Sequence, residues 1–443
     1  MNADLTVGAS PADAKPLQAN DRVCSPGVKL HGAGFIVTPA TARALGLGRV
    51  PGLEGHIRPY LNGKDMTGRS RGVMVLDLFG LAADDVRERF PEVFQHLLLN
   101  VKPERDANNR DSYRNAWWVF GEPRRDFRPA LRGLPRYIAT VETAKHRVFV
   151  FQPAAVLPDN MLVCIASAEA WHLGVLSSRF HVTWALAAGG DLEDRPRYNK
   201  TRCFDPFPFP AATPAQRTAI ARPAEVLDRH RAARLVAHPH LTLTGLYNVL
   251  DALRAGRVLT DAERDVLDVG QVATLQHLHD ELDAAVADAY GWPVTLPAAE
   301  VVARVVALNR ARLAEEAVGQ VRWLRPDYQA PAEQRRKAAQ DAEQAALDVD
   351  VEPPCPPGPR ACRRSMWPCA PPWPAASRPP PPTWPDDSTV SARPSWHPCS
   401  KLWRRWGRLG TLAGGVTWPE RDQDIGRRRA LLQPPPDRPS PCN

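Results

Sequence analysis

The sequence predicts an α+β protein, with a mixed α/β part over residues 1–211 followed by an α-helical part over residues 212–330. Short apolar runs broken by Gly and Pro fill the first part, as is typical of strands. Apolar stripes at helical spacing fill the second part. A sharp rise in Pro content then marks a third region. We expect residues 331–352 to be a charged helix or linker and residues 353–443 to be a disordered tail rich in Pro and Arg.

The strands of the first part are predicted from short apolar runs. Residues 73–78 are apolar at nearly every position, which is typical of a strand covered on both faces. Residues 137–152 indicate two strands joined by a turn, and residues 161–166 indicate a further strand. The turn at residues 143–146 would hold three side chains out at its tip or shoulder: Lys145, His146 and Arg147.

Helices are predicted where apolar residues recur every three or four positions. In the first part this spacing predicts helices over residues 41–48, 82–100 and 169–188. Between the second of these helices and an aromatic cluster, the polar residues 101–115 are expected to form a loop.

The second part shows stronger helix signals. Thr260 and Glu263 form a capping-box pattern ahead of a helix. Residues 272–286 carry one apolar stripe, and residues 296–324 predict a second long amphipathic helix. We therefore expect a helical domain or subdomain over residues 212–330.

The net charge of +8 is distributed unevenly along the chain. Lys and Arg exceed Asp and Glu by 5 in residues 1–211 and by 8 in residues 353–443, and fall short of them by 5 in residues 212–352. A basic balance indicates a nucleic-acid partner. Here that balance belongs to the tail, so the overall charge carries no argument for the folded part.

The tail has an unusual composition. It holds nearly half of the 46 prolines and most of the 13 tryptophans. Such sequence is also what an out-of-frame reading of a GC-rich gene yields, and we expect a frameshifted C-terminus. Its cysteines Cys355, Cys362 and Cys369 form no CxxC pair, so no zinc site is predicted there.

The remaining cysteines indicate the compartment. Cys24, Cys164 and Cys203 are isolated in the sequence, which fits a reducing environment and argues against a disulfide framework. Residues 1–30 lack the basic start and apolar core of a signal peptide, and no run approaches 18 apolar residues. We expect a cytoplasmic protein without a membrane partner.

Three segments share features with active-site signatures without their full pattern. Residues 31–37 have Val37 where a dinucleotide fingerprint has its third Gly, which favours a tight turn. Residues 75–81 share the aspartate-containing strand of S-adenosylmethionine sites but lack the further glycines, which favours a buried strand entering a helix. Residues 204–210 lack the second proline of the loop that clamps a flipped amine base, which favours an exit loop. We predict no catalytic and no metal-ligating residue.

Basic and amide side chains form three clusters in residues 1–211. Asn can pair bidentately with adenine and Arg with guanine, so the first cluster has the chemistry of base readout; the alternative is a solvated loop with internal salt bridges. The other two would contact phosphates if they line one surface, and are ordinary surface otherwise. The candidates are Lys102, Arg105, Asn108, Asn109, Arg110 and Arg114 in the first cluster, Lys145, His146 and Arg147 in the second, and Arg195, Arg197, Lys200 and Arg202 in the third.

An ordered series of long segments is the most specific feature of the chain. It runs PGVKLHGAGFIVTP, IRPYLNGKD, RGVMVLDLFGL, VKPERDANNRDSYRNAWWVFGEPR, LPRYIATVETAKHRVFVF, LPDNMLVCIA, LGVLSSRFHVTWALAAGG and RPRYNKTRCFDPFPFP. This series resembles the target-recognition region of the Mme-type fused restriction and modification enzymes, part of type IIG or IIL. The segments GLYNVLDALRAGRVLTDAERDVLDV and LHDELDAAVADAYGWP resemble the C-terminal helical domain of the same family.

The resemblance carries expectations about function. In that family one polypeptide holds a nuclease, an N6-adenine DNA methyltransferase, a target-recognition domain and a helical domain. It implies that residues 1–211 dock on double-stranded DNA, with the first two clusters at base edges and the third at phosphates. The family's Gly-rich cofactor strand and Asn-Pro-Pro-Tyr loop do not occur here. We therefore expect no cofactor in this chain, with S-adenosylmethionine bound by a methyltransferase core on a separate chain.

Three hypotheses about function follow. The chain is a non-catalytic recognition portion of a site-specific adenine methyltransferase, or it is part of an active split enzyme that works with an upstream chain, or it is an inactive gene fragment.

Overall fold

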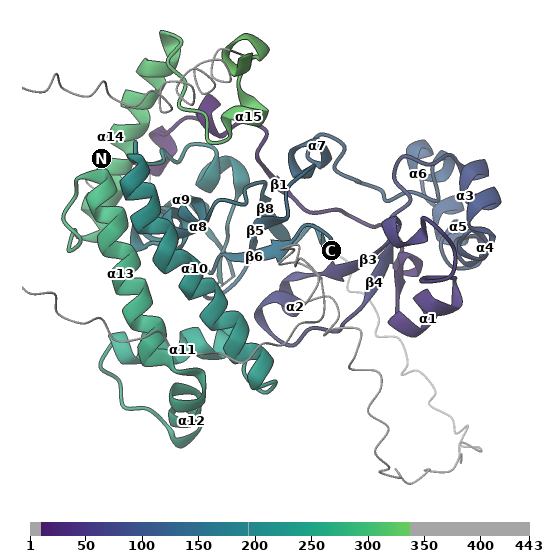
Figure 1. Cartoon of the computed structure of the whole chain (residues 1–443), viewed down its shortest axis with the longest axis horizontal. Coiled ribbons are helices and arrows are strands. Elements are labelled where there is room, and N and C mark those ends of the chain that lie inside the picture. Colours follow the sequence, from purple (N-terminus) through teal and green to yellow (C-terminus); the bar gives the residue numbers. More distant parts are fainter. Residues whose placement is uncertain (1–9, 194, 337–443) are drawn as a thin grey trace, which may run out of the picture. The chain divides into compact units, whose positions relative to one another are not determined.

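The computed structural model describes residues 10–193 and 195–336, which all lie in one compact unit of the chain. Strands and helices are interspersed up to residue 204, and beyond it the elements of the described residues are helices joined by turns and loops (Figure 1). The predicted α+β class is confirmed. The predicted tail at 353–443 and most of the predicted linker at 331–352 lie outside the described residues.

A four-stranded antiparallel sheet lies in the larger of two hydrophobic cores. The β5–β6 pair has Ala139 opposite Val150, which confirms the predicted hairpin. Strand β8 is buried at every residue, which accounts for an apolar sequence without alternation. The strands, in sheet order, are β1 (Cys24–Pro26), β8 (Leu162–Ile165), β5 (Arg136–Val141) and β6 (Val150–Pro153).

A second sheet lies in the smaller core, with strands in the order β2 (Ile36–Val37), β4 (Met74–Leu76), β3 (Ile57–Leu61) and β7 (Leu157–Pro158). Strand β3 pairs antiparallel with β4 and parallel with β7. The predicted strand at 73–78 is β4, with Val75 and Leu76 fully buried. The helices of this part are α1 (Pro39–Ala44), α3 (Ala83–Arg89), α4 (Pro91–Asn100), α5 (Lys102–Asp106) and α6 (Asp111–Asn115).

The single helix predicted over 82–100 is wrong, because the chain forms α3 and α4 with a break at Phe90. Pro91 has no N–H, and a proline disfavours helical dihedrals in the residue before it. Phe90 accordingly has φ −136° and ψ 60°. The four predicted apolar positions are nevertheless buried: Val86, Phe90, Val93 and Leu97.

The helix predicted over 169–188 is also two helices, α8 (Ala170–Ser177) and α9 (Arg179–Gly189). They are separated by Ser178, whose backbone is extended with φ −71° and ψ 156°. The Arg179 backbone N–H donates to the Asp283 carboxylate at 2.7 Å. A carboxylate about a hundred residues away in sequence therefore satisfies the first free donor of α9, which no local pattern could show.

The loop predicted over 101–115 is instead mostly helical. Pro103 lies in the first turn of α5, where its missing N–H removes no helical hydrogen bond, and α6 follows after a short turn. The expectation of a loop is therefore wrong.

The second part of the chain confirms the predicted helical signals. Thr260 and Glu263 form a reciprocal capping box at the start of α12. The apolar stripe at 272–286 is buried on α13, and the helix predicted over 296–324 is shorter than expected. The helices are α10 (Pro214–Ala237), α11 (Leu243–Arg254), α12 (Asp261–Gly270), α13 (Val272–Tyr290), α14 (Ala298–Ala317) and α15 (Pro326–Gln329).

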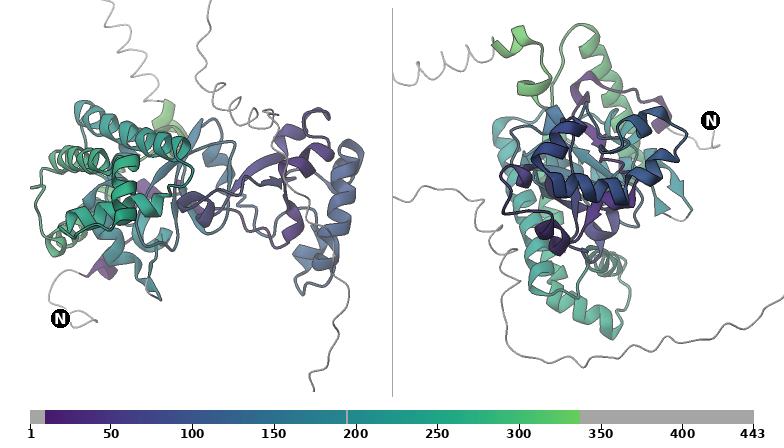
Figure 2. Two further views of the ribbon diagram at one scale, coloured as in Figure 1. Left: turned by 90° about the horizontal axis from the view of Figure 1, so that it is seen from below. Right: turned by 90° about the vertical axis from the view of Figure 1, so that its right-hand side faces the viewer.

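These helices share the larger core with the first sheet, so the two parts are packed as one body. Figure 2 shows the teal and green helices gathered at one end of the described residues and the elements of the second sheet at the other. The N-terminal segment is tied to the helices, since the backbone N–H groups of Gln18 and Ala19 donate to the Glu316 carboxylate on α14. The predicted boundary at residue 211 stays a prediction.

Candidate nucleic-acid interface

The turn between β5 and β6 holds the second predicted cluster, and its residues differ in exposure. Lys145 is exposed, whereas Arg147 is only 8% exposed. The Arg147 guanidinium donates to the carbonyl oxygens of Val141 and Pro196 and to Thr140 Oγ1. Burial lowers the pKa of Arg147 to about 10. The prediction that Arg147 stands out at the tip is therefore wrong, because the turn carbonyls need its donors.

A short hairpin of β9 (Asp191–Leu192) and β10 (Arg195–Pro196) packs against this turn. The Ala144 N–H donates to the Pro196 carbonyl at 3.3 Å, and the Tyr198 N–H donates to the Glu142 carbonyl at 2.6 Å. Arg197 Nε donates to the Glu142 carboxylate at 2.7 Å. The structure thus brings the second and third predicted clusters together on one surface.

The approach of the hairpin depends on a glycine. A Cβ atom at Gly189, the last residue of α9, would lie 1.9 Å from the Arg197 carbonyl oxygen. A side chain at this position would displace the hairpin, so the sequence Gly189–Gly190 does more than end a helix.

The remaining residues of the third cluster differ in exposure. Lys200 donates to the Asp205 carboxylate at 2.7 Å. Burial lowers the pKa of Lys200, but the hydrogen bond to Asp205 and the negative charge of Asp205 together outweigh burial, so the net shift of the pKa is upward. Arg195 on β10 and Arg202 on the one-turn helix η5 (Lys200–Phe204) are both exposed. Within residues 10–193 and 195–336, the Arg202 side chain makes no hydrogen bond or ion pair.

Sequence reasoning missed a basic segment on the other side of the turn, formed by α2 (Gly63–Thr67) and residues 68–72. A Cβ at Gly63 would lie 2.9 Å from Val141 at the end of β5, so α2 packs directly beside the turn. Lys64 and Arg69 are exposed and have no polar partner among the described residues. The sequence signal for this segment is the presence of three basic residues within eight positions, from Lys64 to Arg71. The prediction of basic clusters did not include them.

The first predicted cluster lies elsewhere, on α5 and α6 of the smaller core. Arg105 is 1% exposed, and its guanidinium donates to the carbonyl oxygens of Leu30 and Val119, both at 2.9 Å. Burial lowers the pKa of Arg105. The Nη2 group is therefore committed to the protein, while Nε and Nη1 are buried without a hydrogen-bond partner among the described residues. Contact of Arg105 with a base stays an untested prediction.

The other members of the first cluster are largely paired within it. Lys102 bonds Asp106 at 2.6 Å, Arg114 pairs with Asp111, and Arg110 donates to the Tyr113 hydroxyl at 3.1 Å. The Asn108 Oδ1 accepts the Arg110 N–H, and Asn109 is exposed. Across the described ranges, no hydrogen bond or ion pair joins this cluster to the turn or to the β9–β10 hairpin.

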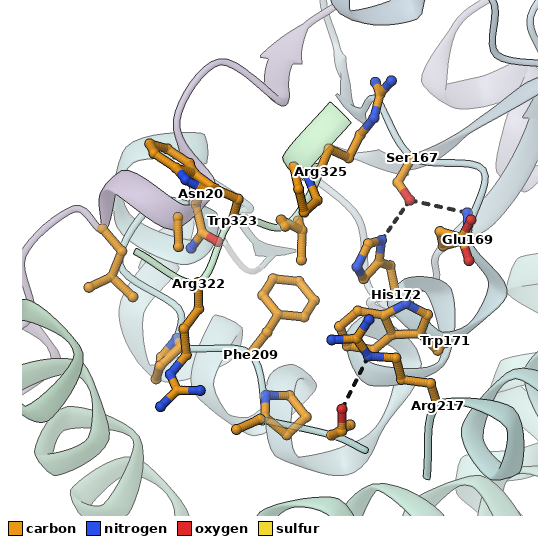
Figure 3. Close-up of a pocket in the computed structure, with 18 of the residues that line it drawn as sticks. Asn20, Ser167, Glu169, Trp171, His172, Phe209, Arg217, Arg322, Trp323 and Arg325 are labelled. Carbon is orange, nitrogen blue, oxygen red and sulfur yellow. Dashed lines mark hydrogen bonds between the residues drawn. The ribbon is translucent and has the colours of Figure 1, made fainter. Parts of the chain in front are cut away.

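A cavity of about 850 Å³ lies away from these clusters, between the N-terminal segment, the start of α8 and the chain after α14 (Figure 3). Trp171, His172 and Phe209 line it. His172 Nδ1 lies 2.6 Å from Ser167 Oγ, and full burial lowers the pKa of His172 to about 3, so its ring is neutral at physiological pH.

The cations at this cavity are engaged by the protein. Arg217 donates to the Ala212 carbonyl and lies over the Trp171 ring, 4.9 Å from its centroid. Arg325 donates to two backbone carbonyl oxygens, and Arg312 and Arg322 share the carboxylate of Glu315. The cavity therefore presents little uncompensated positive charge to a phosphate.

In the segments that share features with active-site signatures, the acidic side chains are engaged by basic side chains of the protein. Asp77, which follows β4, accepts from Arg128 at 2.8 Å and from Arg58 at 3.4 Å, so its carboxylate is not open to a cofactor hydroxyl. The residues present thus do not fit S-adenosylmethionine at this strand. Asp205 is held by Lys200. The described part of the chain contains no group of three or more His, Cys, Asp or Glu side chains placed to hold a metal ion.

No helix among the described residues is both long and apolar enough to cross a membrane.

Comparison with known proteins identifies what the part of the chain that carries this surface is similar to. The family model of the MmeI target recognition domain matches residues 15–211, which include the turn, the hairpin and α2. DNA methyltransferase A of Bacillus subtilis (strain 168) is 34% identical over 76 residues, which are 17% of this chain and 9% of that protein.

A solved structure shares the fold. The type IIL restriction-modification enzyme MmeI, determined in complex with DNA, superposes with a TM-score of 0.53 at 19% identity over 70% of this chain. The chain covers 38% of that protein. Residues 15–211 therefore belong to the family of MmeI-type target recognition domains.

Proposed function

We propose that this chain is the DNA sequence-recognition portion of a site-specific N6-adenine DNA methyltransferase of a restriction-modification system. It binds double-stranded DNA through a basic face, defined here as α2 with residues 68–72, the turn at 142–148, the β9–β10 hairpin and η5. The observation that supports the proposal is that exposed cations from segments far apart in sequence, Lys64, Arg69, Lys145 and Arg202, lie on elements packed around one turn.

The chemistry of the basic face divides into two tasks. Exposed Lys and Arg side chains without a carboxylate partner are the ones that can neutralise phosphates and release counterions, which fixes register without reading sequence. Lys145 on the turn and Arg195 on β10 are our candidates for contact with base edges in a groove.

Salt-dependent binding of the full chain to duplex DNA tests the face. A Lys64→Ala/Arg69→Ala variant should bind more weakly and should flatten the plot of log K against log salt by about 2 units, since each lost phosphate contact removes roughly one unit. Arg43→Ala/Arg222→Ala removes two exposed cations outside the face and is the matched control. Equal losses in both variants would show that the face has no special role.

A second candidate is that the chain works within an active split enzyme. The match to a DNA methyltransferase supports it. A separate methyltransferase core would bind S-adenosylmethionine, which supplies the methyl group, while this chain positions the target duplex.

Methylation assays separate the two candidates from a gene fragment. Purified chain alone should neither bind S-adenosylmethionine in calorimetry nor label DNA, and labelling should appear only after an upstream methyltransferase chain is added. Binding of S-adenosylmethionine by the chain alone would contradict the proposal that a separate methyltransferase core binds the cofactor. Absence of duplex binding would identify an inactive fragment.

A further inference from the structure

Asn248 on α11 contacts two polar side chains of the turn in the basic face, Lys145 and His146. Lys145 Nζ lies 2.7 Å and His146 Nε2 lies 2.8 Å from the same atom, Asn248 Oδ1. Two donors that differ in chemistry are thus oriented by one amide oxygen. Asn248 belongs to the helical part and lies outside residues 15–211, which match the recognition family.

The imidazole of His146 is held on further sides by the same helix. Its Nδ1 lies 3.3 Å from Asp251 Oδ2, and its ring centroid lies 6.0 Å from that of Tyr247. The Tyr247 hydroxyl is in turn bonded to His279 Nε2 at 2.8 Å and to Arg231 at 2.9 Å. The side chain of His146 is only 10% exposed as a result.

Helix α10 holds the strand that leaves the turn. Arg231, 1% exposed, donates to the Phe149 carbonyl at 2.8 Å, and Asp228 Oδ1 accepts the Phe151 N–H at 3.2 Å. Strand β6 is an edge of the sheet, so these contacts occupy backbone groups that would otherwise lack a partner. Both ends of the turn are therefore fixed, one by the β9–β10 hairpin and the other by α10.

We propose that Asn248 is a positioning residue for target recognition. Lys is among the side chains with the most rotamer freedom to lose on binding, and an orientation set before DNA arrives lowers that cost. A recognition group must also keep its geometry for a wrong base to be penalised. The helical part thereby contributes to target selection through the turn, without being part of the recognition family match. This inference rests on the proposed DNA binding.

Two substitutions separate positioning from folding in the full chain. Asn248→Leu removes the acceptor at similar size, whereas Asn248→Asp keeps an oxygen for Lys145 and His146. Gln276→Leu, an amide-to-Leu change on α13 at a side chain with no polar partner in the described ranges, is the control. The wild-type preferred duplex is first selected from a randomised library, and dissociation constants are then measured for it and for a shuffled duplex.

The selectivity ratio is the main readout. Asn248→Leu should lower it about 10-fold, the size of one lost base contact, while affinity for the shuffled duplex and the melting temperature stay near wild type. Asn248→Asp and Gln276→Leu should keep the ratio within about 3-fold. An unchanged ratio in Asn248→Leu would overturn the proposal, and so would equal losses in Leu and Asp variants.

Hydrogen exchange gives a readout that does not depend on DNA. Amides of residues 143–148 should exchange faster in Asn248→Leu than in the wild type or in Gln276→Leu. If the wild type prefers no duplex, the proposed function fails, and unchanged exchange in the turn would separately refute the positioning role.

Discussion

Burial determines which of the basic residues are available to a partner. Arg105 and Arg147 are nearly as buried as the apolar core, and their guanidiniums satisfy backbone carbonyls. Lys64 and Arg69, which no prediction included, are exposed instead. The sequence shows where basic residues are concentrated, but it does not show whether a given side chain points into the protein or into solvent. This is why the clusters could be located from the sequence while the roles of their members could not.

Substitution of Arg147 tests whether a buried arginine of the predicted cluster stabilises the fold. Arg147→Met should lower the free energy of unfolding by about 3 kcal/mol, because the carbonyl oxygens of Val141 and Pro196 would lose their donor in a buried site. Urea denaturation at neutral pH measures the change, with exposed Arg202→Met expected to stay within about 0.5 kcal/mol of wild type. Wild-type stability combined with lost DNA binding would instead assign Arg147 to base contact.

Helix boundaries show how far local patterns can be trusted at the scale of elements. The β5–β6 hairpin, β4 and the stripe on α13 were predictable because the apolar spacing that defines each one is local. Pro91 also predicts the helix break at Phe90, because a proline disfavours helical dihedrals in the residue before it. The predicted helix over 82–100 did not take this proline into account. The break at Ser178 could not be predicted from the local sequence, since the carboxylate that accepts the N–H of the next residue, Arg179, belongs to Asp283 on α13.

Asp283 carries a pH dependence that can be measured. Burial raises the pKa of Asp283 to about 6, against an ordinary value near 4. A raised folded-state pKa gives stability that is fully present below about pH 4 and is lost as the pH rises through about 6. Asp283→Asn keeps the oxygen that accepts the Arg179 N–H and removes the charge. The variant should gain about 2 kcal/mol over wild type at pH 7.5 and about zero near pH 4.

Thermal or urea unfolding of both proteins across this pH range checks the expectation. A difference that is constant with pH would mean that Asp283 ionises normally.

At the scale of the whole molecule, the recognition part and the helical part share one hydrophobic core. Leu275 and Val286 of α13 belong to the same cluster as Ile138 and Ile165 of the first sheet. The sequence predicted two domains from a change in composition, and composition cannot report which surfaces pack together. The basic face is likewise a tertiary arrangement of α2, a turn and a hairpin.

Truncation tests this shared core. A fragment ending at residue 211 should be poorly soluble or should unfold without a cooperative transition, because it would lose the apolar side chains that α10, α11, α13 and α14 contribute to the core shared with the first sheet. Calorimetry of the fragment beside the full chain is the measurement. A fragment with a sharp transition and full DNA affinity would establish residues 1–211 as an independent domain.

The central claim is that this chain selects duplex DNA by sequence. The most direct measurement is the ratio of its dissociation constants for a duplex selected from a randomised library and for a shuffled duplex, at a fixed physiological salt concentration. The account predicts a ratio of at least about 1,000 for the wild type, as for other specific DNA-binding proteins. Equal affinity for the two duplexes would contradict it.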